Sequence, residues 1–280
     1  TGQSAVTAAT VLTNNSANTL TINNLNLSSN LTTAAGSPVI VEGLTQVLAT
    51  AVLTNNSANT LTLNNLNIGA AFTLAGTGST AINGLTQVTA AVSVTSNLSV
   101  PFTFGHEVRL GANLALTTAA QEITFGGGLT LTGATPAVTL TVRNAGGAVI
   151  NNGINLSLDS GTAHNLILGV TSAAGLEING PIVDGGTAGG WITVTTGNVT
   201  ISGNSTYSGG TTLTAGGLII GTDTSLGTGT LRLVAGTFNA GSGNRLLSNP
   251  VALAGTHTIT GGGNITFTGL NNSVAAASVV

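Results

Sequence analysis

The sequence predicts an all-β protein folded as a single parallel β-helix, or β-solenoid, spanning residues 1–280 with turns of about 20 residues. Short runs of alternating apolar and polar residues are typical of strands, and no run keeps a helical period for three turns. The stretch Leu12–Leu27 returns as Leu53–Ile68, displaced by 41 residues. Towards the end of the chain, apolar residues recur at close to half that displacement, as Leu231 does at Val251.

The internal repeat aligns Leu12–Ala49 with Leu53–Ala90 without a gap, at 22 identities in 38 positions. A fixed offset without insertions means that each copy fills the same geometric slot. In a β-solenoid, successive turns stack about 4.8 Å apart through parallel backbone ladders. One copy of the repeat therefore predicts two turns.

Each copy interrupts its alternating pattern at a pair of asparagines. Asparagine tolerates the left-handed backbone region and bonds its own backbone, so such a pair suits a bend between two short strands. A hairpin is the alternative, but a two-residue reversal usually has glycine at its second position. We therefore expect four structural corners of a coil, at Asn23, Asn24, Asn64 and Asn65.

The chain divides into three segments of one solenoid. Residues 1–90 contain the two copies of the repeat, and residues 91–190 contain diverged turns separated by Gly, Asn and Pro. Residues 191–280 regain a sharp spacing. At about 20 residues per turn, the chain predicts roughly 14 turns and a stack about 65 Å long.

Charged residues are scarce: four are basic, seven are acidic, and together they make up 4% of the chain. Ordinary globular chains are about one quarter charged, and low charge favours association. Nucleic acid is not an expected partner, because its binding needs clustered cations and stacking rings. No run approaches the roughly 18 apolar residues of a membrane helix, so no membrane-spanning segment is expected. The absence of cysteine excludes a disulfide framework.

One segment resembles a known family. Ile201–Leu233 reads ISGNSTYSGGTTLTAGGLIIGTDTSLGTGTLRL, with the core N-x-T-Y-S-G-G-T-T at Asn204–Thr212 followed by AGGLIIG and SLGTGTL. This segment and its continuation, LSNPVALAGTHTITGGGNITFTGL, resemble the autotransporter-associated β-strand repeat of secreted bacterial passenger domains. The resemblance implies a parallel β-helix located outside a bacterial cell.

Because β-helices host polysaccharide lyases and hydrolases, carboxylates on adjacent turns are the first catalytic candidates. Asp159 and Glu177 are separated in sequence by close to one turn. Cleavage of a glycosidic bond needs two carboxylates about 5 to 9.5 Å apart, facing one groove. Trp191 and Tyr207 are the only large amphipathic rings. Isolated corner carboxylates are the simpler interpretation, and no catalytic residue is expected.

The remaining ionisable residues predict neither a metal nor a cofactor site. Glu107 and Arg109 lie two apart on one strand face, which indicates an exposed ion pair. The histidines are widely separated without cysteine nearby, and the Gly/Asp nonapeptide of calcium-binding solenoids is missing. The candidates weighed are His106, His164, His257, Asp184 and Asp223.

Both ends of the sequence are apolar and uncharged, reading QSAVTAATVL and NNSVAAASVV. A solenoid exposes unpaired backbone groups at each end, and soluble monomers usually cap them. Uncapped ends favour head-to-tail stacking into an open filament. The residues expected to take part in self-association are Val6, Val11, Leu12, Val274, Val279 and Val280.

These observations predict a non-enzymatic extracellular structural protein of a bacterial surface, a subunit of a self-assembling fibre. The expected partner is another copy of the chain, with a cell-surface or matrix polysaccharide as a second partner. A tethered autotransporter-type adhesin passenger, working as a single rod, is the alternative. A polysaccharide-acting β-helix enzyme is the third hypothesis.

Overall fold

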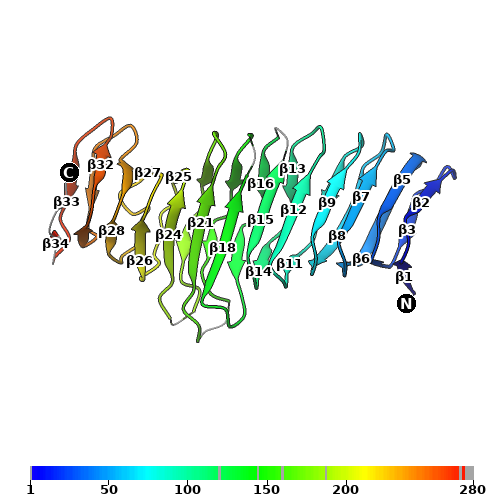
Figure 1. Ribbon diagram of the computed structural model, residues 1–280, viewed down its shortest axis with the longest axis horizontal. Coiled ribbons are helices and arrows are strands. Elements are labelled where there is room, and N and C mark those ends of the chain that lie inside the picture. Colours follow the sequence, from blue (N-terminus) through cyan, green and yellow to red (C-terminus); the bar gives the residue numbers. More distant parts are fainter. Residues whose placement is uncertain are drawn as a thin grey trace.

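The strands stack into a continuous coil whose turns follow the sequence from one end to the other (Figure 1). This computed structural model describes residues 2–118, 121–143, 145–158, 161–186, 188–270 and 273–274, with only the backbone at 35 and 274. All strand pairs in this part are parallel, and no helix occurs in it. The predicted fold class, an all-β parallel solenoid, is confirmed.

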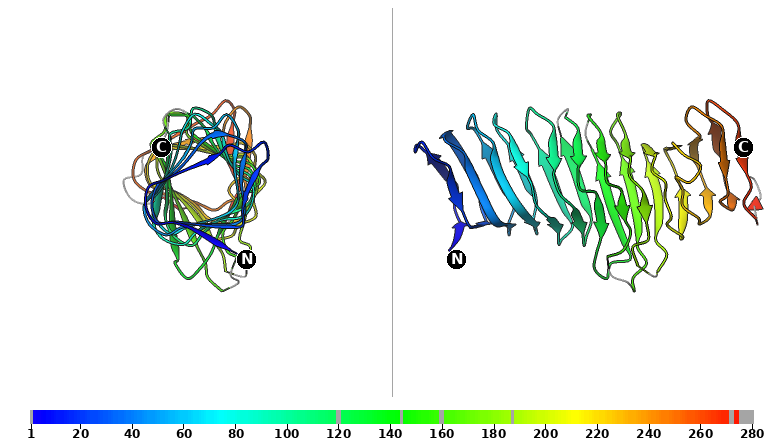
Figure 2. Two further views of the ribbon diagram at one scale, coloured as in Figure 1. Left: turned by 90° about the vertical axis from the view of Figure 1, so that its right-hand side faces the viewer. Right: turned by 180° about the vertical axis from the view of Figure 1, so that it is seen from behind.

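Most turns of the coil contribute strands to three columns, which surround a common axis when viewed along it (Figure 2). The first column starts each turn, and it takes the first parts of two longer strands, β6 and β8. Its members are β3 (Leu20–Ile22), β6 (Val39–Val47), β8 (Leu61–Ile68), β10 (Thr80–Ile82), β13 (Phe102–Phe104), β16 (Ile123–Phe125), β19 (Ala148–Ile150), β22 (Leu176–Ile178), β25 (Asn198–Ile201), β27 (Gly217–Ile220), β29 (Gly236–Asn239) and β32 (His257–Thr260).

The second column follows after a bend and includes the second parts of β6 and β8. Its other members are β1 (Gln3–Val6), β4 (Asn24–Leu27), β11 (Thr86–Val88), β14 (Val108–Leu110), β17 (Leu129–Leu131), β20 (Ile154–Asn155) and β23 (Ile182–Val183). In the last turns the same place is taken by a separate pair, β30 (Arg245–Leu247) and β33 (Ile265–Phe267).

The third column is a sheet of 13 strands. Its members are β2 (Thr10–Asn14), β5 (Leu31–Gly36), β7 (Ala51–Asn55), β9 (Phe72–Ala75), β12 (Val92–Ser96), β15 (Leu114–Thr118), β18 (Ala137–Val142), β21 (Asn165–Val170), β24 (Trp191–Thr196), β26 (Gly210–Leu213), β28 (Leu231–Leu233), β31 (Val251–Leu253) and β34 (Ser273–Val274).

The inward side chains of all three columns form one hydrophobic core along the axis. Strand β8 shows the pattern, since Leu61, Leu63, Leu66 and Ile68 are buried and the other residues, including the Asn64–Asn65 bend, are half-buried or exposed. Residues in the same position on successive turns stack, as do the rings of Phe104 and Phe125, whose centroids lie 5.3 Å apart. The two-residue alternation of the sequence therefore places the apolar side chains in the interior of the coil and the polar side chains on its exterior.

The internal repeat corresponds to two turns, because Leu20 of β3 pairs with Val39 of β6, and Val39 pairs with Leu61 of β8. At the bend, the Asn24 side-chain oxygen accepts a hydrogen bond of 2.9 Å from the Leu44 amide. Asn65 accepts the equivalent bond from Leu85 at 3.0 Å in the second copy. The Asn-Asn turn and the Gly-Leu turn are thus complementary partners that alternate along the stack.

The glycine of the Gly-Leu turn is required by close packing. Gly43 donates its amide to the Asn23 carbonyl at 2.7 Å, and a Cβ on Gly43 would lie 2.2 Å from that oxygen. A Cβ on Gly84 would lie 2.3 Å from the Asn64 carbonyl oxygen. Any larger residue must push the two turns apart, which explains why a glycine occurs at this position in both copies.

The middle turns are longer than the sequence spacing predicts. Leu114 pairs with Leu140, and Ala137 pairs with Asn165, so each of these turns contains several residues more than the expected length. The extra residues form loops that protrude along one edge of the stack (Figure 1, green). The predicted count of about 14 turns is therefore wrong, and the chain makes about 12. At about 4.8 Å per turn, the stack is about 58 Å long.

Candidate functional site

The first described turn leaves the start of the coil open. Strands β1, β2 and β3 pair with β4, β5 and β6, and no other described strand covers their outer edges. A cavity of about 480 Å³ opens there, lined by Val6, Leu12, Leu20 and Ile22 among others. Val6 is buried, Leu12 is half-buried, and Val11 is 67% exposed. Apolar side chains and free backbone groups thus meet at this face.

The last described turn has the same character. Among the described residues, β32, β33 and β34 pair only with β29, β30 and β31. Ile259, Ile265 and Phe267 are only partly buried against the core, and Leu270 is 80% exposed. Val274 belongs to β34 by its backbone, while Val279 and Val280 lie outside the described residues.

Of the two carboxylates considered for catalysis, only Glu177 belongs to the described part of the chain. Glu177 is exposed on the outer face of β22, and Asp159 lies outside the described residues. Glu107 forms the predicted ion pair with Arg109 at 2.8 Å, and it also accepts a hydrogen bond of 2.5 Å from the Thr130 hydroxyl. This group occupies the surface of the second column and has only one carboxylate.

The histidines and aspartates have separate structural settings. His164 is buried with Nε2 3.0 Å from the Gly133 carbonyl oxygen, whereas His106 is exposed. His257 is buried, with neither ring nitrogen hydrogen-bonded. Asp223 accepts from the Leu246 amide at 3.2 Å. Over the described ranges, no three His, Cys, Asp or Glu residues gather as a metal site would require.

Asp184 links two loops through hydrogen bonds and thereby acts as a clamp between them. Its carboxylate accepts hydrogen bonds from the Gly190 amide at 2.8 Å and from the Ser208 hydroxyl at 2.8 Å. It also accepts from the Ser208 amide at 3.1 Å. The clamp ties the loop before β24 to the loop before β26 and leaves the carboxylate engaged by protein donors.

Tyr207, from the segment that resembles the autotransporter repeat, is fully buried in the core. Its hydroxyl is hydrogen-bonded to that of Thr211. Burial raises the pKa of Tyr207 well above its usual value, although the hydrogen bond with Thr211 partly offsets this effect. Asn204 accepts from the Thr224 hydroxyl of the next turn at 2.8 Å. The motif residues therefore hold an irregular part of the second column together.

A buried asparagine in each copy was not anticipated from the sequence. Asn55 has no exposed surface, and its side chain donates to the carbonyls of Asn59 at 2.9 Å and Ser79 at 2.6 Å. Its oxygen accepts from the hydroxyls of Ser57 at 2.8 Å and Thr33 at 3.0 Å. The signal was present in the unchanged repetition of LTNNSANT, which contains this residue in both copies.

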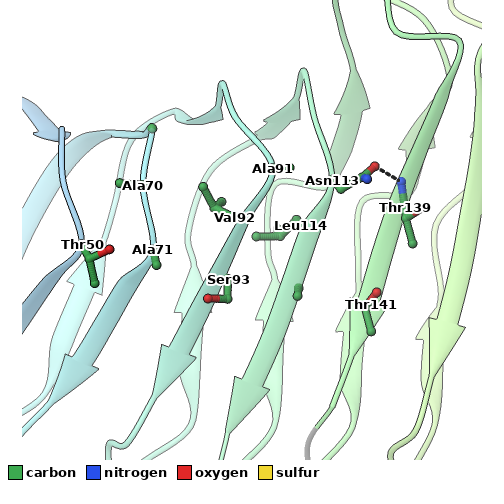
Figure 3. A pocket seen from close by; sticks show the side chains of 12 residues that line it. Thr50, Ala70, Ala71, Ala91, Val92, Ser93, Asn113, Leu114, Thr139 and Thr141 are labelled. Atoms are coloured by element: carbon green, nitrogen blue, oxygen red, sulfur yellow. Dashed lines mark hydrogen bonds between the residues drawn. The ribbon is translucent and has the colours of Figure 1, made fainter.

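A shallow groove of about 600 Å³ crosses the outer face of the third column (Figure 3). Small side chains such as Ala71, Ser93 and Ala115 form its floor, because each stands where an outward strand residue would otherwise fill the space. Asn113 and Thr139 are linked by a hydrogen bond of 2.8 Å from the Thr139 amide. No ionisable side chain lines this groove.

A scan against family models finds no match, and searches of curated proteins and of solved structures find none either. No helix in the described part of the chain is long and apolar enough to cross a membrane.

Proposed function

We propose that this chain is a non-enzymatic extracellular structural protein that assembles head to tail into a fibre. One observation carries the proposal: both described end turns present the same three columns as open, parallel ladders. The last turn of one copy can therefore extend the ladders of the second and third columns of the next copy, with β33 against β1 and β34 against β2. Such a contact joins unlike ends, so it propagates into a filament unless its rotation closes a ring.

The side chains at the two ends support this contact. Leu20 and Ile22 at the start, and Ile259 and Phe267 at the end, are apolar residues left partly in solvent. Stacking two turns would bury them at about 25 cal/mol per Å² of apolar surface. No Asp, Glu, Lys or Arg occurs in residues 1–41 or 246–280, so neither end segment carries a charged side chain that would oppose edge-to-edge pairing. Natural sheet edges that must remain single usually carry such charges.

The extracellular location is part of the same proposal and is supported by the resemblance of Ile201–Leu233 to the autotransporter-associated repeat. Members of that family work outside the bacterial cell. The same resemblance favours a second candidate, a tethered adhesin passenger whose edges receive further turns of the same polypeptide. The two candidates differ in whether a free copy binds the end of another copy.

The test is negative-stain electron microscopy with sedimentation velocity at neutral pH, over a range of protein concentrations. We expect filaments for the natural chain and single rods for Leu12→Lys, because the lysine would place a charge in the cavity of the first turn. The matched control is Leu48→Lys, at a leucine that is 56% exposed elsewhere in the coil, and it should keep the filaments. Circular dichroism establishes that both variants fold.

Single rods about 58 Å long at every concentration of the natural chain would overturn the fibre and favour the tethered passenger. Equal filament loss in both lysine variants would show that charge anywhere prevents association, and would overturn end-to-end stacking as its mechanism.

A further inference from the structure

Trp191, the only tryptophan of the chain, lies exposed on the outer face of the third column. It is the first residue of β24, where Ile192 points into the core and Trp191 points outward with 42% of its surface exposed. Its ring lies against the next turn at Gly209, where an added Cβ would come within 3.2 Å of Trp191 Cδ2. Gly209 and Gly210 have no side chains, so none separates the ring from the backbone of the next turn.

The backbone that carries this ring is fixed by hydrogen bonds. The Trp191 amide donates to the His164 carbonyl at 2.9 Å, and the preceding amide, Gly190, is held by Asp184 at 2.8 Å. Asp184 simultaneously holds Ser208, immediately before the glycines on which the ring lies. An aromatic side chain has few rotatable bonds, so on a fixed backbone it loses little conformational freedom on binding a ligand.

Polar groups adjoin the ring on the same face. Asn165 pairs with Trp191 across the ladder, and its side-chain oxygen accepts a hydrogen bond of 2.9 Å from the Thr193 hydroxyl. Both side chains are half-buried and point outward, as Trp191 does. Beyond the bond that links them, an amide and a hydroxyl offer further donors and acceptors beside the ring.

The same face continues from the ring into the groove. Thr193 pairs with Ile167 of β21, and Ile167 pairs with Thr139, which lines the groove in Figure 3. From β24 to the far side of the groove at Thr50, directly before β7, is six steps of the ladder, or about 29 Å at about 4.8 Å per step. The groove and the ring therefore lie along one track of the outer face, parallel to the coil axis, with the outward-facing Ile167 between them.

We propose that this track, with Trp191 as its stacking platform, binds a neutral polysaccharide that lies along the coil. The apolar C–H face of a sugar ring packs on an exposed indole, while hydroxyls exchange hydrogen bonds with side chains such as Asn165 and Thr193. The groove lining has no ionisable group, and Asp184 beside the platform is engaged by protein donors. An acidic glycan or a nucleic acid would need basic residues here, and a small apolar ligand would need an enclosed pocket.

The single tryptophan makes the proposal directly measurable by intrinsic fluorescence. Soluble oligosaccharides of β-glucan, α-glucan, xylan and mannan are titrated into the natural chain, with oligogalacturonate as the acidic comparison. We expect at least one neutral glycan to shift the emission and to protect Trp191 from acrylamide quenching, with no effect of oligogalacturonate. Calorimetry measures the same binding in variants that lack the fluorophore.

Trp191→Ala should weaken binding at least about tenfold, and Trp191→Phe should recover part of it, because a smaller ring still stacks. The control Leu246→Ala removes another exposed apolar side chain, on β30, and should bind like the natural chain. No binding to any neutral glycan, equal affinity in Trp191→Ala, or preference for oligogalacturonate would each overturn the proposal. Since none of these readouts depends on filaments, the result is independent of the head-to-tail proposal.

Discussion

Alkaline pH provides a sharp test of the buried tyrosine. Tyr207 is the only tyrosine, and the chain has no lysine and no cysteine. Between about pH 9 and pH 12, the unfolded chain therefore has one titrating side chain, with a pKa near 10. Burial raises the pKa of Tyr207 in the folded chain, so folding favours the protonated phenol. Stability is thus full below about pH 10 and falls as the pH rises above it.

The slope of this loss is about 1.4 kcal/mol per pH unit, so unfolding at pH 11.5 should require about 2 kcal/mol less than at pH 8. Tyr207→Phe removes the titration and leaves the buried Thr211 hydroxyl without its partner, at a cost of about 1 kcal/mol. The natural chain should therefore be the more stable protein at pH 8, and the phenylalanine variant the more stable one at pH 11.5.

Urea unfolding followed by circular dichroism gives the two stabilities, and absorbance at 295 nm reports tyrosinate. The folded chain should show no tyrosinate at pH 11.5. Ionisation of the folded chain near pH 10, or the same alkaline loss in both proteins, would refute the reasoning that the phenol lies in a dry core.

Three further predictions concern the coil itself, each measured as the free energy of unfolding in urea. Asn55→Ala should cost about 3 to 5 kcal/mol, because several buried groups lose their hydrogen-bond partner. The control Asn56→Ala, at an exposed neighbour, should change stability by under about 0.5 kcal/mol. Equal losses in the two variants would contradict the importance of the hydrogen bonds of Asn55. Gly84→Ala should cost about 2 to 3 kcal/mol through its contact with the preceding turn, whereas Gly169→Ala, whose Cβ would meet nothing nearer than 3.6 Å, should be tolerated. Arg109→Ala should cost less than about 1 kcal/mol, as expected for a partly exposed ion pair, and a larger loss would mean that the pair holds the second column together.

The fold class was predictable because two independent signals agree. Alternation at Leu20 and Ile22 sets the strand period, and the offset between the two copies of the repeat sets the length of two turns. The turn count was not predictable, because the extra residues of the middle turns lie in loops before Ala137, Asn165 and Trp191. Loops carry no periodicity, so composition cannot separate a long turn from an additional one.

The surfaces were harder to predict than the coil. Asn55 belongs to a polar stretch typical of an exposed corner, and it is buried only because the neighbouring turns cover it. Tyr207 and Trp191 are both amphipathic rings in sequence, yet one is enclosed and the other lies on the surface. Trp191 alternates with the buried Ile192 on a regular strand, so its exposure could have been predicted from the sequence. Tyr207 lies in irregular backbone, where no such alternation indicates which side chains point inward.

The alternation of Asn-Asn and Gly-Leu turns imposes a rule on how this part of the rod can change its length. Asn24 and Asn65 each receive the Gly-Leu backbone of the following turn. Duplication of a whole two-turn unit preserves every such junction and adds about 10 Å to the rod. Duplication of a single turn would place two like corners in contact, with either two asparagine pairs competing for one space or two glycines leaving an amide unpaired. Insertions and deletions in residues 1–90 are therefore expected to comprise even numbers of turns. The pair of turns, and not the single turn, is the unit that can be duplicated or deleted in this segment.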